Sequence, residues 1–272
     1  MKTKYTSSFI IALFFSVSIF AQEFQGSATY KSARKVDLKM DDSAANSEMK
    51  KQIEEQLKKQ FQREYTLNFN RGESLYKQNE QLAKPNPVAN SGIQIQVQEG
   101  SDILYKNIKE NRFTNETEIY GKQFLIKDSL VSRKWELKNE TKNIGDYVCY
   151  KAIFKEEYTT QTISSSNTLE KVTKERTTTA WYTPQIPINT GPGDFHGLPG
   201  LILEINDGEL TLVCTKIVMN PKETFEINEP RKGKVVSQEK FDEIMDKKNK
   251  EMMDRMQSRR GEGERVMISI GG

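Results

Sequence analysis

Apolar and polar residues alternate with a period of two over many short stretches, a spacing typical of β-strands that bury one face. Tyr65–Phe69 and Ser74–Tyr76 follow this pattern on either side of Arg71-Gly72, which predicts a hairpin. Asn206-Asp207-Gly208 predicts a second hairpin between two further strands. In chain order, the other predicted strands are Phe24–Leu38, Ile103–Lys106, Arg112–Tyr120, Lys122–Lys127, Lys134–Leu137, Tyr147–Lys155, Thr177–Thr183, Leu201–Ile205 and Glu209–Met219.

Two stretches change to a helical period. Ser43 is a candidate cap for a helix in which four apolar residues recur at every fourth position: Met49, Ile53, Leu57 and Phe61. Ser237 is a candidate cap for a second helix that ends at about Ser258, with Phe241 and Ile244 on its apolar face. Because few helices separate the strands, we expect a mainly β, α+β fold. The prediction is a single antiparallel sheet, curved or half-barrel, with an N-terminal and a C-terminal flanking helix.

Other segments carry no regular pattern. Gln78–Gly100 contains Pro85 and Pro87 and is predicted to be a loop, with Ile93, Ile95 and Val97 as the alternating positions of a short edge strand. A segment rich in Thr, Ser and Asn between Lys155 and Thr177 is predicted to be a variable loop. No linker divides the chain, so we expect one domain over residues 22–258 and a flexible tail over residues 259–272.

The first 21 residues have the pattern of a secretory signal peptide. Lys2 and Lys4 precede an uncharged run, Phe9–Phe20, and Ala21 offers a small residue at the cleavage site. The run is shorter than the ~20 residues that span a bilayer, which favours a cleaved signal over an uncleaved anchor. No Cys follows it, so a lipid anchor is not expected, and the mature chain has no other run of spanning length. We therefore predict a periplasmic or secreted protein.

Composition narrows the classes of partner. The 41 basic and 38 acidic residues give a net charge of +3, too small a surplus for nucleic acid to be the main partner. The two cysteines, Cys149 and Cys214, form a disulfide in an oxidising compartment or remain two buried thiols, and the sequence leaves both open.

Candidate chemistry concentrates in residues 179–207, which are rich in Pro and Gly and contain the only histidine, His196. Leu198-Pro199-Gly200 fits a type II turn, which makes this segment a rigid connection or a ligand-facing loop. Exposed backbone N–H groups and an aromatic wall would then bind a ligand. The candidate binding residues are Trp181, Tyr182, Phe195, His196, Gly197, Leu198, Pro199 and Gly200.

Catalytic and metal-binding patterns are sparse. Asp194 and His196 are a candidate acid/base pair, and Glu204 is a polar residue within an apolar strand. A single histidine excludes zinc sites with several His ligands, and we find no nucleophile elbow, phosphate loop or dinucleotide fingerprint, so no cofactor is expected. Four methionines at helical spacing suggest a soft-metal site for copper(I) or a packing stripe: Met245, Met252, Met253 and Met256.

One motif resembles a known family. His196 is followed by Gly-Leu-Pro-Gly-Leu-Ile at residues 197–202, and upstream lie Trp135-Glu136-Leu137, residues 145–152 (GDYVCYKA), Ala180-Trp181-Tyr182-Thr183, Ile186-Pro187 and Gly191-Pro192. In this order the motifs resemble the GLPGLI family of bacterial secreted proteins, over about Asp128 to Val218. The resemblance implies export, a mainly antiparallel β domain and no established activity.

Three functions are carried forward from the sequence. The first is a non-enzymatic binding or accessory protein of the cell envelope that uses residues 179–207 and the sheet to hold a small hydrophobic ligand or a partner protein. The second is a hydrolase that uses Asp194, His196 and Glu204. The third is a soft-metal binder that uses the Met-rich helix with His196.

Overall fold

The computed structural model describes residues 24–35, 51, 53–55, 57, 58, 61–80, 102–119, 121–163, 169–223 and 225–258. The predicted signal peptide (residues 1–21) and the tail (residues 259–272) lie outside the described residues. So do Ile93, Ile95 and Val97, where a short edge strand is predicted.

Among the described residues, twelve strands form one sheet, in the order β12-β6-β5-β4-β3-β2-β1-β11-β10-β9-β8-β7. The mainly β prediction is confirmed. The first six strands along the chain are β1 (Gln25–Arg34), β2 (Glu64–Asn70), β3 (Glu73–Gln78), β4 (Ile103–Asn107), β5 (Arg112–Ile119) and β6 (Lys122–Ser129). The others are β7 (Glu136–Ile144), β8 (Tyr147–Ile163), β9 (Leu169–Thr183), β10 (Leu201–Asn206), β11 (Leu210–Met219) and β12 (Lys234–Val236).

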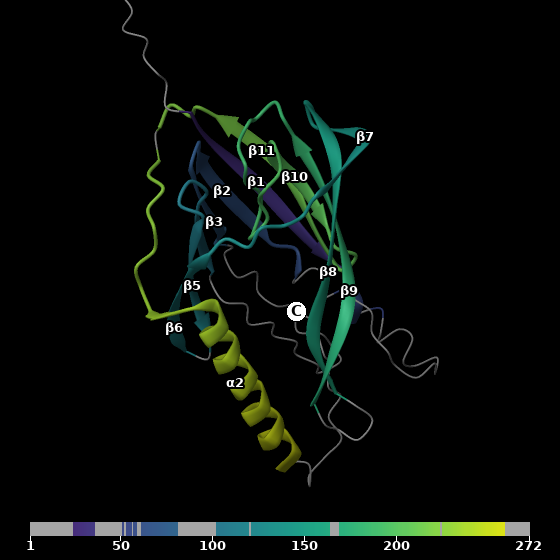
Figure 1. Ribbon diagram of the computed structural model, residues 1–272, viewed down its shortest axis with the longest axis vertical. Coiled ribbons are helices and arrows are strands. Elements are labelled where there is room, and N and C mark those ends of the chain that lie inside the picture. The colour runs from purple at the N-terminus through teal and green to yellow at the C-terminus, as the bar shows by residue number, and fades with distance from the viewer. Residues whose placement is uncertain are drawn as a thin grey trace, which may run out of the picture.

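Strand β1 joins two antiparallel halves of the sheet. It pairs with β2 on one side and with β11 on the other. Strands β2 to β6 follow one another outward from β1, and β11 to β7 do so on the opposite side. The described pairings are antiparallel except that of β12 with β6, which is parallel, so the sheet is mixed and not purely antiparallel. The sheet curls, with β6 on one side and β8–β9 on the other, and residues 130–135 cross between them (Figure 1).

Both predicted hairpins are confirmed. Strands β2 and β3 meet at Arg71-Gly72, and Asn70 Oδ1 accepts hydrogen bonds from the backbone N–H groups of Gly72 and Glu73, both at 2.8 Å. Strands β10 and β11 meet at Asn206-Asp207-Gly208 as the turn sequence indicates, and Gly208 has a φ of +94°.

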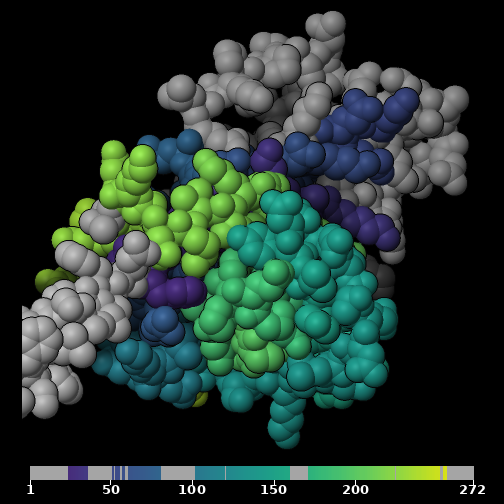
Figure 2. All heavy atoms as spheres, turned by 90° about the horizontal axis from the view of Figure 1, so that it is seen from above, coloured from purple at the N-terminus to yellow at the C-terminus, as the bar shows by residue number. Residues whose placement is uncertain are grey.

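Two predictions about strand bounds are wrong. Lys134 and Trp135 belong to the connection before β7, which begins at Glu136. Between Lys155 and Thr177, residues 156–163 and 169–176 are not loop, because they belong to β8 and β9, which pair there as a long hairpin. The sequence pattern predicts a loop there because the residues are mostly Thr and charged. A pair of strands with two solvated faces needs no alternating apolar side chains. Viewed from above, the teal atoms of β7 and β8 adjoin green atoms of residues that come later in the sequence (Figure 2).

The core is built by the alternating apolar residues of the central strands. Ala28, Tyr30, Leu67 and Phe69 of β1 and β2 are buried together with Leu201 and Leu203 of β10. A neighbouring cluster joins the other half of the sheet through Ala152, Ala180, Tyr182, Ile202 and Ile205. Residues 51–61 are helical at their described positions, and the predicted stripe of Ile53, Leu57 and Phe61 is buried.

The C-terminal helix α2 (Gln238–Ser258) packs on the edge of the sheet. Ser237 Oγ accepts a hydrogen bond from the Lys240 backbone N–H at 3.2 Å, as the predicted cap requires. Phe241 meets Phe124 edge to face with ring centroids 5.5 Å apart, and Phe124 also packs with Val236 of β12. Three residues are too few for an alternating pattern, which is why β12 is absent from the sequence prediction.

Cys149 and Cys214 are free thiols, buried in the same core cluster. The structure therefore shows the second of the two alternatives and not the disulfide. Burial raises the pKa of Cys149 to about 11 and that of Cys214 to about 12, so both thiols stay protonated and unreactive near neutral pH. Within the described part of the chain, no helix is both long and apolar enough to cross a membrane.

The connection between β9 and β10, residues 184–200, lies against the sheet and is called the strap here. Two glycines allow it to approach other segments closely. A Cβ on Gly200 would lie 2.2 Å from the Thr183 carbonyl oxygen, and one on Gly191 would lie 2.7 Å from Ile202 Cβ. The predicted type II turn is wrong, because Gly200 does not have a positive φ. Gly200 is required for lack of space, not for backbone freedom.

We expect Gly200→Ala to lower the free energy of unfolding by about 3 kcal/mol, because the new Cβ would overlap backbone atoms that cannot move independently. Gly145→Ala is the matched control, since Gly145 has a φ of +56° and open space around its Cα. The control should cost only about 1 kcal/mol, the strain of a left-handed alanine. Urea unfolding of the two variants measures both values, and equal losses would contradict the close approach.

Candidate ligand-binding site

A buried lysine on the sheet holds the strap in place. Lys106 of β4 is fully buried, and its Nζ donates hydrogen bonds to three strap carbonyls. The acceptors are the oxygens of Gly191 at 2.9 Å, Gly193 at 2.6 Å and Phe195 at 3.1 Å. Sequence reasoning missed Lys106, because a single Lys in a short strand gives no signal of burial.

The charge of Lys106 is set by two opposing effects. Burial lowers the pKa of Lys106 to about 7, Asp194 acts to raise it and Arg133 to lower it further. The three carbonyl acceptors favour the ammonium form, because an ammonium has three N–H donors and a neutral amine only two. The strap is therefore bound most completely when Lys106 is charged.

Further bonds fix the strap beside Lys106. Ser74, directly opposite Lys106 in the sheet, forms a hydroxyl–hydroxyl hydrogen bond with Thr190 at 3.1 Å. The Thr190 carbonyl accepts from the Ile202 backbone N–H at 3.1 Å, and Thr190 also bridges to His196. The strap thus bends back on itself and is joined to β3, β4 and β10.

The connection between β6 and β7 clamps the outer side of the strap. Arg133, whose side chain is only 10% exposed, donates to the Asp194 carbonyl at 2.8 Å and forms an ion pair with the Asp194 carboxylate. Its guanidinium lies over the rings of Phe195 and Phe154, 4.9 Å and 5.9 Å from their centroids. Trp135 Nε1 donates to the His196 carbonyl at 2.9 Å.

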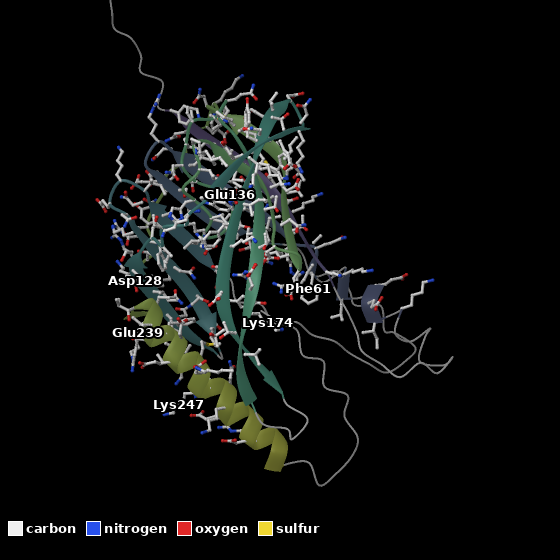
Figure 3. The ribbon with its side chains drawn as sticks, turned by 45° about the vertical axis from the view of Figure 1, so that its right-hand side comes forward. Phe61, Asp128, Glu136, Lys174, Glu239 and Lys247 are labelled. Carbon is white, nitrogen blue, oxygen red and sulfur yellow. The ribbon has the colours of Figure 1, made fainter. Side chains whose placement is uncertain are left out.

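A cavity of about 540 Å³ lies between the strap, strands β4–β6, residues 128–133 and the start of α2. Part of its wall is apolar and consists of Leu104, Phe113, Leu130 and Val131. The polar part consists of Lys106, Asn115, Asp128, Ser129, Arg133, Asp194, His196 and Gln238. Figure 3 labels Asp128 near the beginning of α2, beside Glu239. The Gln238 backbone N–H donates to Asp128 Oδ2 at 3.1 Å, which ties the helix to this wall.

Asn115 is the polar group of this cavity that stays unsatisfied. It lies on β5, on the same face as Phe113 and opposite Leu104 of β4. Its Oδ1 atom is buried and accepts no hydrogen bond from the described residues. A buried carbonyl oxygen without a donor costs about 1–3 kcal/mol. This oxygen is shielded from the cavity, which Asn115 lines with its other atoms.

His196 presents a second acceptor. Its Nδ1 lies 2.9 Å from the Asp194 carbonyl oxygen, so Nδ1 carries the proton that this bond needs. Burial lowers the pKa of His196 below its usual value of 6.5, and Lys106 and Arg133 lower it further, while the bond to Asp194 acts in the opposite direction. The ring is therefore neutral at pH 7, with a lone pair on Nε2.

A smaller hollow of about 220 Å³ lies on another side of the same strap segment. Tyr65 and Tyr76 line it and stack with their rings 5.1 Å apart and nearly parallel, at 9°. Gly193, Asp194 and Phe195 form part of its wall. Residues 194 and 195 therefore separate an aromatic hollow from the larger, partly polar cavity.

The structure does not gather all the binding residues predicted from the sequence. Trp181 and Tyr182 are neighbours on β9, so their side chains point to opposite faces. Trp181 carries Lys142 Nζ at 4.5 Å from its ring centroid, whereas Tyr182 is buried beside Tyr150. Among the predicted residues, Phe195 lines the smaller hollow and His196 lines the larger cavity.

The other predicted binding residues shape the end of the strap. Gly197 has a φ of +98° and donates its backbone N–H to Asn189 Oδ1. Leu198 is buried, Pro199 is exposed and Gly200 approaches Thr183. Their roles here are conformational.

The proposed catalytic set does not converge. The Asp194 carboxylate faces Arg133, and only its backbone carbonyl reaches His196. Glu204 pairs with Lys142 at 2.7 Å and does not line either cavity. The hydrogen bond that an Asp194–His196 acid/base pair needs between its side chains is thus replaced by two others.

Most of the site that the soft-metal alternative needs lies outside the described side chains. Met245 is half-buried, and the side chains of Met252, Met253 and Met256 lie outside the described residues. Over the described ranges, no cluster of three or more His, Cys, Asp or Glu residues is placed to hold a metal ion.

Comparison with known proteins gives a family match over the strap and the strands around it. Residues 135–204 match the family described as "Protein of unknown function (Porph_ging)". The match covers the motifs on which the resemblance to the GLPGLI family is based and is compatible with it. A search of curated proteins finds no match.

Among solved structures, the chain is similar to two of PNGF-II, one in space group C2 and one in P21. The identities are 12% and 14%, and the TM-scores are 0.48 and 0.49. In both, the similarity covers 82% of this chain and 33% of the other, so this chain spans about a third of their length.

We expect Lys106→Met to lower the free energy of unfolding at pH 8 by about 2–4 kcal/mol, because the buried strap carbonyls lose the N–H donors of Lys106. Lys155→Met is the control: Lys155 is 67% exposed and lies 3.8 Å from Glu175, so its loss should cost less than about 0.5 kcal/mol. Denaturant unfolding measures both, and a neutral Lys106→Met would contradict the anchoring role.

The same pair of proteins tests the pKa of Lys106. Its pKa in the folded chain, about 7, is below the ordinary 10.5, so between these values the unfolded chain binds a proton that the folded chain has released. The stability of the natural protein should therefore rise from pH 7 to pH 9 relative to Lys106→Met, by at most about 1.4 kcal/mol per pH unit. The raised pKa values of Cys149 and Cys214 affect both proteins equally, so the difference isolates Lys106.

Proposed function

We propose that this is an exported, non-enzymatic protein of the cell envelope that binds a small molecule in the cavity beneath the strap. The observation that carries the proposal is the cavity of about 540 Å³ itself, whose wall combines the apolar side chains of Leu104 and Phe113 with the ring of His196. Small-molecule sites are concave and mostly apolar, with a few placed polar groups that orient the ligand.

The construction of the cavity supports binding. Its walls come from strands β4 to β6, the connection to β7, the strap and α2, and most of these are joined by hydrogen bonds. Walls held in this way lose little conformational freedom when a ligand enters, which favours affinity. A volume of about 540 Å³ is in the range of small-molecule sites.

The polar groups favour binding over catalysis. Asp194 is committed to Arg133 and Glu204 to Lys142, so His196 has no carboxylate partner from the predicted set. A general base without a positioned nucleophile or second acid is not enough for hydrolysis. The apolar wall of Leu104 and Phe113 accommodates the apolar part of a ligand, and Asn115 and His196 give it orientation.

Export is proposed on the residues of the first 21 positions alone. The mature chain would begin at Gln22, in the periplasm or outside the cell. A protein of this kind meets its ligand in the envelope, where it is to be recovered for the test.

We expect protein taken from the periplasmic fraction of its own host to carry a bound small molecule and to begin at Gln22, both read by native mass spectrometry. Asn115→Leu should lose the bound molecule. It should also raise the free energy of unfolding by about 1 kcal/mol, because it removes an unsatisfied buried oxygen and keeps the volume. The matched control is Asn143→Leu on the exposed face of β7, which should retain the molecule.

Two results would contradict the proposal. The natural protein could carry no small molecule, or all three proteins could carry it equally. A loss of binding together with a loss of stability in Asn115→Leu would show that Asn115 is a structural residue.

A further inference from the structure

The wall of the larger cavity contains one carboxylate, that of Asp128, which no cation of the described chain balances. Asp128 accepts hydrogen bonds from the backbone N–H groups of Ser129 at 2.8 Å and Gln238 at 3.1 Å. These bonds lower the pKa of Asp128, so its carboxylate is ionised at neutral pH. No Lys, Arg or His side chain in the described ranges forms an ion pair with it. Its partners are therefore neutral, and its charge is left for a ligand to balance.

Two lysines close to Asp128 in the sequence or in the fold are engaged elsewhere. Lys127 precedes it in β6 and so faces the opposite side of the sheet, where its Nζ lies 3.0 Å from Glu229 Oε1. Lys240, in the first turn of α2, pairs with Glu243 at 2.6 Å. Neither lysine therefore supplies the positive charge that Asp128 lacks.

The other charges of the cavity lie at the strap. Arg133 keeps N–H donors beyond the two that bind Asp194, but the Asp194 carboxylate offsets its charge and lines the same cavity. An anion that approached Arg133 would be repelled by this carboxylate. Lys106 is fully buried behind three strap carbonyls, and burial lowers its pKa to about 7, so at pH 8 it is mostly neutral. The unbalanced charge of the cavity is thus the negative charge of Asp128.

Apolar side chains lie beside this charge. Phe113 of β5 is directly opposite Asp128 in the β5–β6 ladder, and both residues line the cavity. The Cβ atoms of such a pair lie about 5 Å apart, so a cation bound by Asp128 would also lie near the Phe113 ring. Leu104, Leu130 and Val131 form the rest of the apolar wall.

From this combination we propose that the cavity binds an amphipathic primary amine, with its ammonium group at Asp128 and its apolar part against Phe113 and Leu104. An ammonium has three N–H donors, and the Ser129 hydroxyl, 3.4 Å from Asp128 Oδ1, is a second acceptor on the same wall. This inference rests on the proposed function and adds the chemical class of the ligand.

Three probes with a common phenyl-alkyl skeleton separate charge from apolar contact: 2-phenylethylamine, 2-phenylethanol and 3-phenylpropionate. Calorimetric titration of the full mature chain at pH 8 and low salt measures the affinity of each. We expect the amine to bind about tenfold more tightly than the alcohol, because only the amine gains the ion pair and the contact with the Phe113 ring. The carboxylate should bind most weakly, since Asp128 and Asp194 repel it.

Asp128→Asn removes the charge and keeps an oxygen that accepts from the Ser129 and Gln238 N–H groups. Its affinity for the amine should fall about tenfold, to that of the alcohol. The matched control is Asp146→Asn, because Asp146 is exposed in the β7–β8 turn and does not line the cavity. The control should bind the amine as the natural protein does.

Four results would overturn the amine class: equal affinities of the natural protein for the amine and the alcohol, tighter binding of the carboxylate, equal amine affinities of the two variants, or no binding of any probe. The comparison of the three probes uses the natural protein, so it decides the class even if Asp128→Asn does not fold. The molecule retained in the envelope tests the proposed function separately. A retained neutral or anionic molecule that is lost in Asn115→Leu would support the cavity and remove only the amine.

Discussion

The ammonium group of Lys106 is the constraint on which the cavity depends. A chain that crosses the inside of a curled sheet brings backbone carbonyls away from water, and each must find a donor. Lys106 provides three donors from one point on β4, and the strap bends so that the oxygens of Gly191, Gly193 and Phe195 meet there. The position of His196 and the boundary between the two hollows follow from that bend.

The proposed site is assembled from segments far apart in the sequence. Lys106 and Asn115 lie on neighbouring strands, Arg133 on the connection that crosses the sheet, and His196 on the strap. The labelled residues Asp128 and Glu136 in Figure 3 mark the two ends of that connection. Antiparallel strands alone would leave an open face, and it is the strap and this connection, clamped by Arg133 and Trp135, that enclose a volume.

Much of the fold could be predicted because period-two alternation is a local property. The hairpins at Arg71-Gly72 and Asn206-Asp207-Gly208, and the capped helix after Ser237, follow from short-range patterns. The long β8–β9 hairpin could not, since its polar strands bury little and lack alternation. Glu204 also illustrates the limit: a β-bulge between Ile202 and Glu204 changes which face each residue takes, and no sequence signal reveals it.

The site itself was predictable only at the strap. His196 stands out in the sequence because it is unique in the chain, and Phe195 because it is aromatic within a Pro- and Gly-rich segment. Lys106, Asn115 and Arg133 are common residue types. Lys106 and Arg133 matter because they are buried and bind residues 61 to 89 positions away, and Asn115 because it lines the cavity. Such contacts become visible only when the sheet is closed.

Hydrogen exchange of the strap amides in Lys106→Met tests most directly whether Lys106 holds the cavity together. The account predicts faster exchange for the Ile188 and Ile202 N–H groups, which bond within the strap and to it, and unchanged exchange at the β1–β2 pairing. Equal exchange of the strap amides in the natural protein and the variant would contradict it.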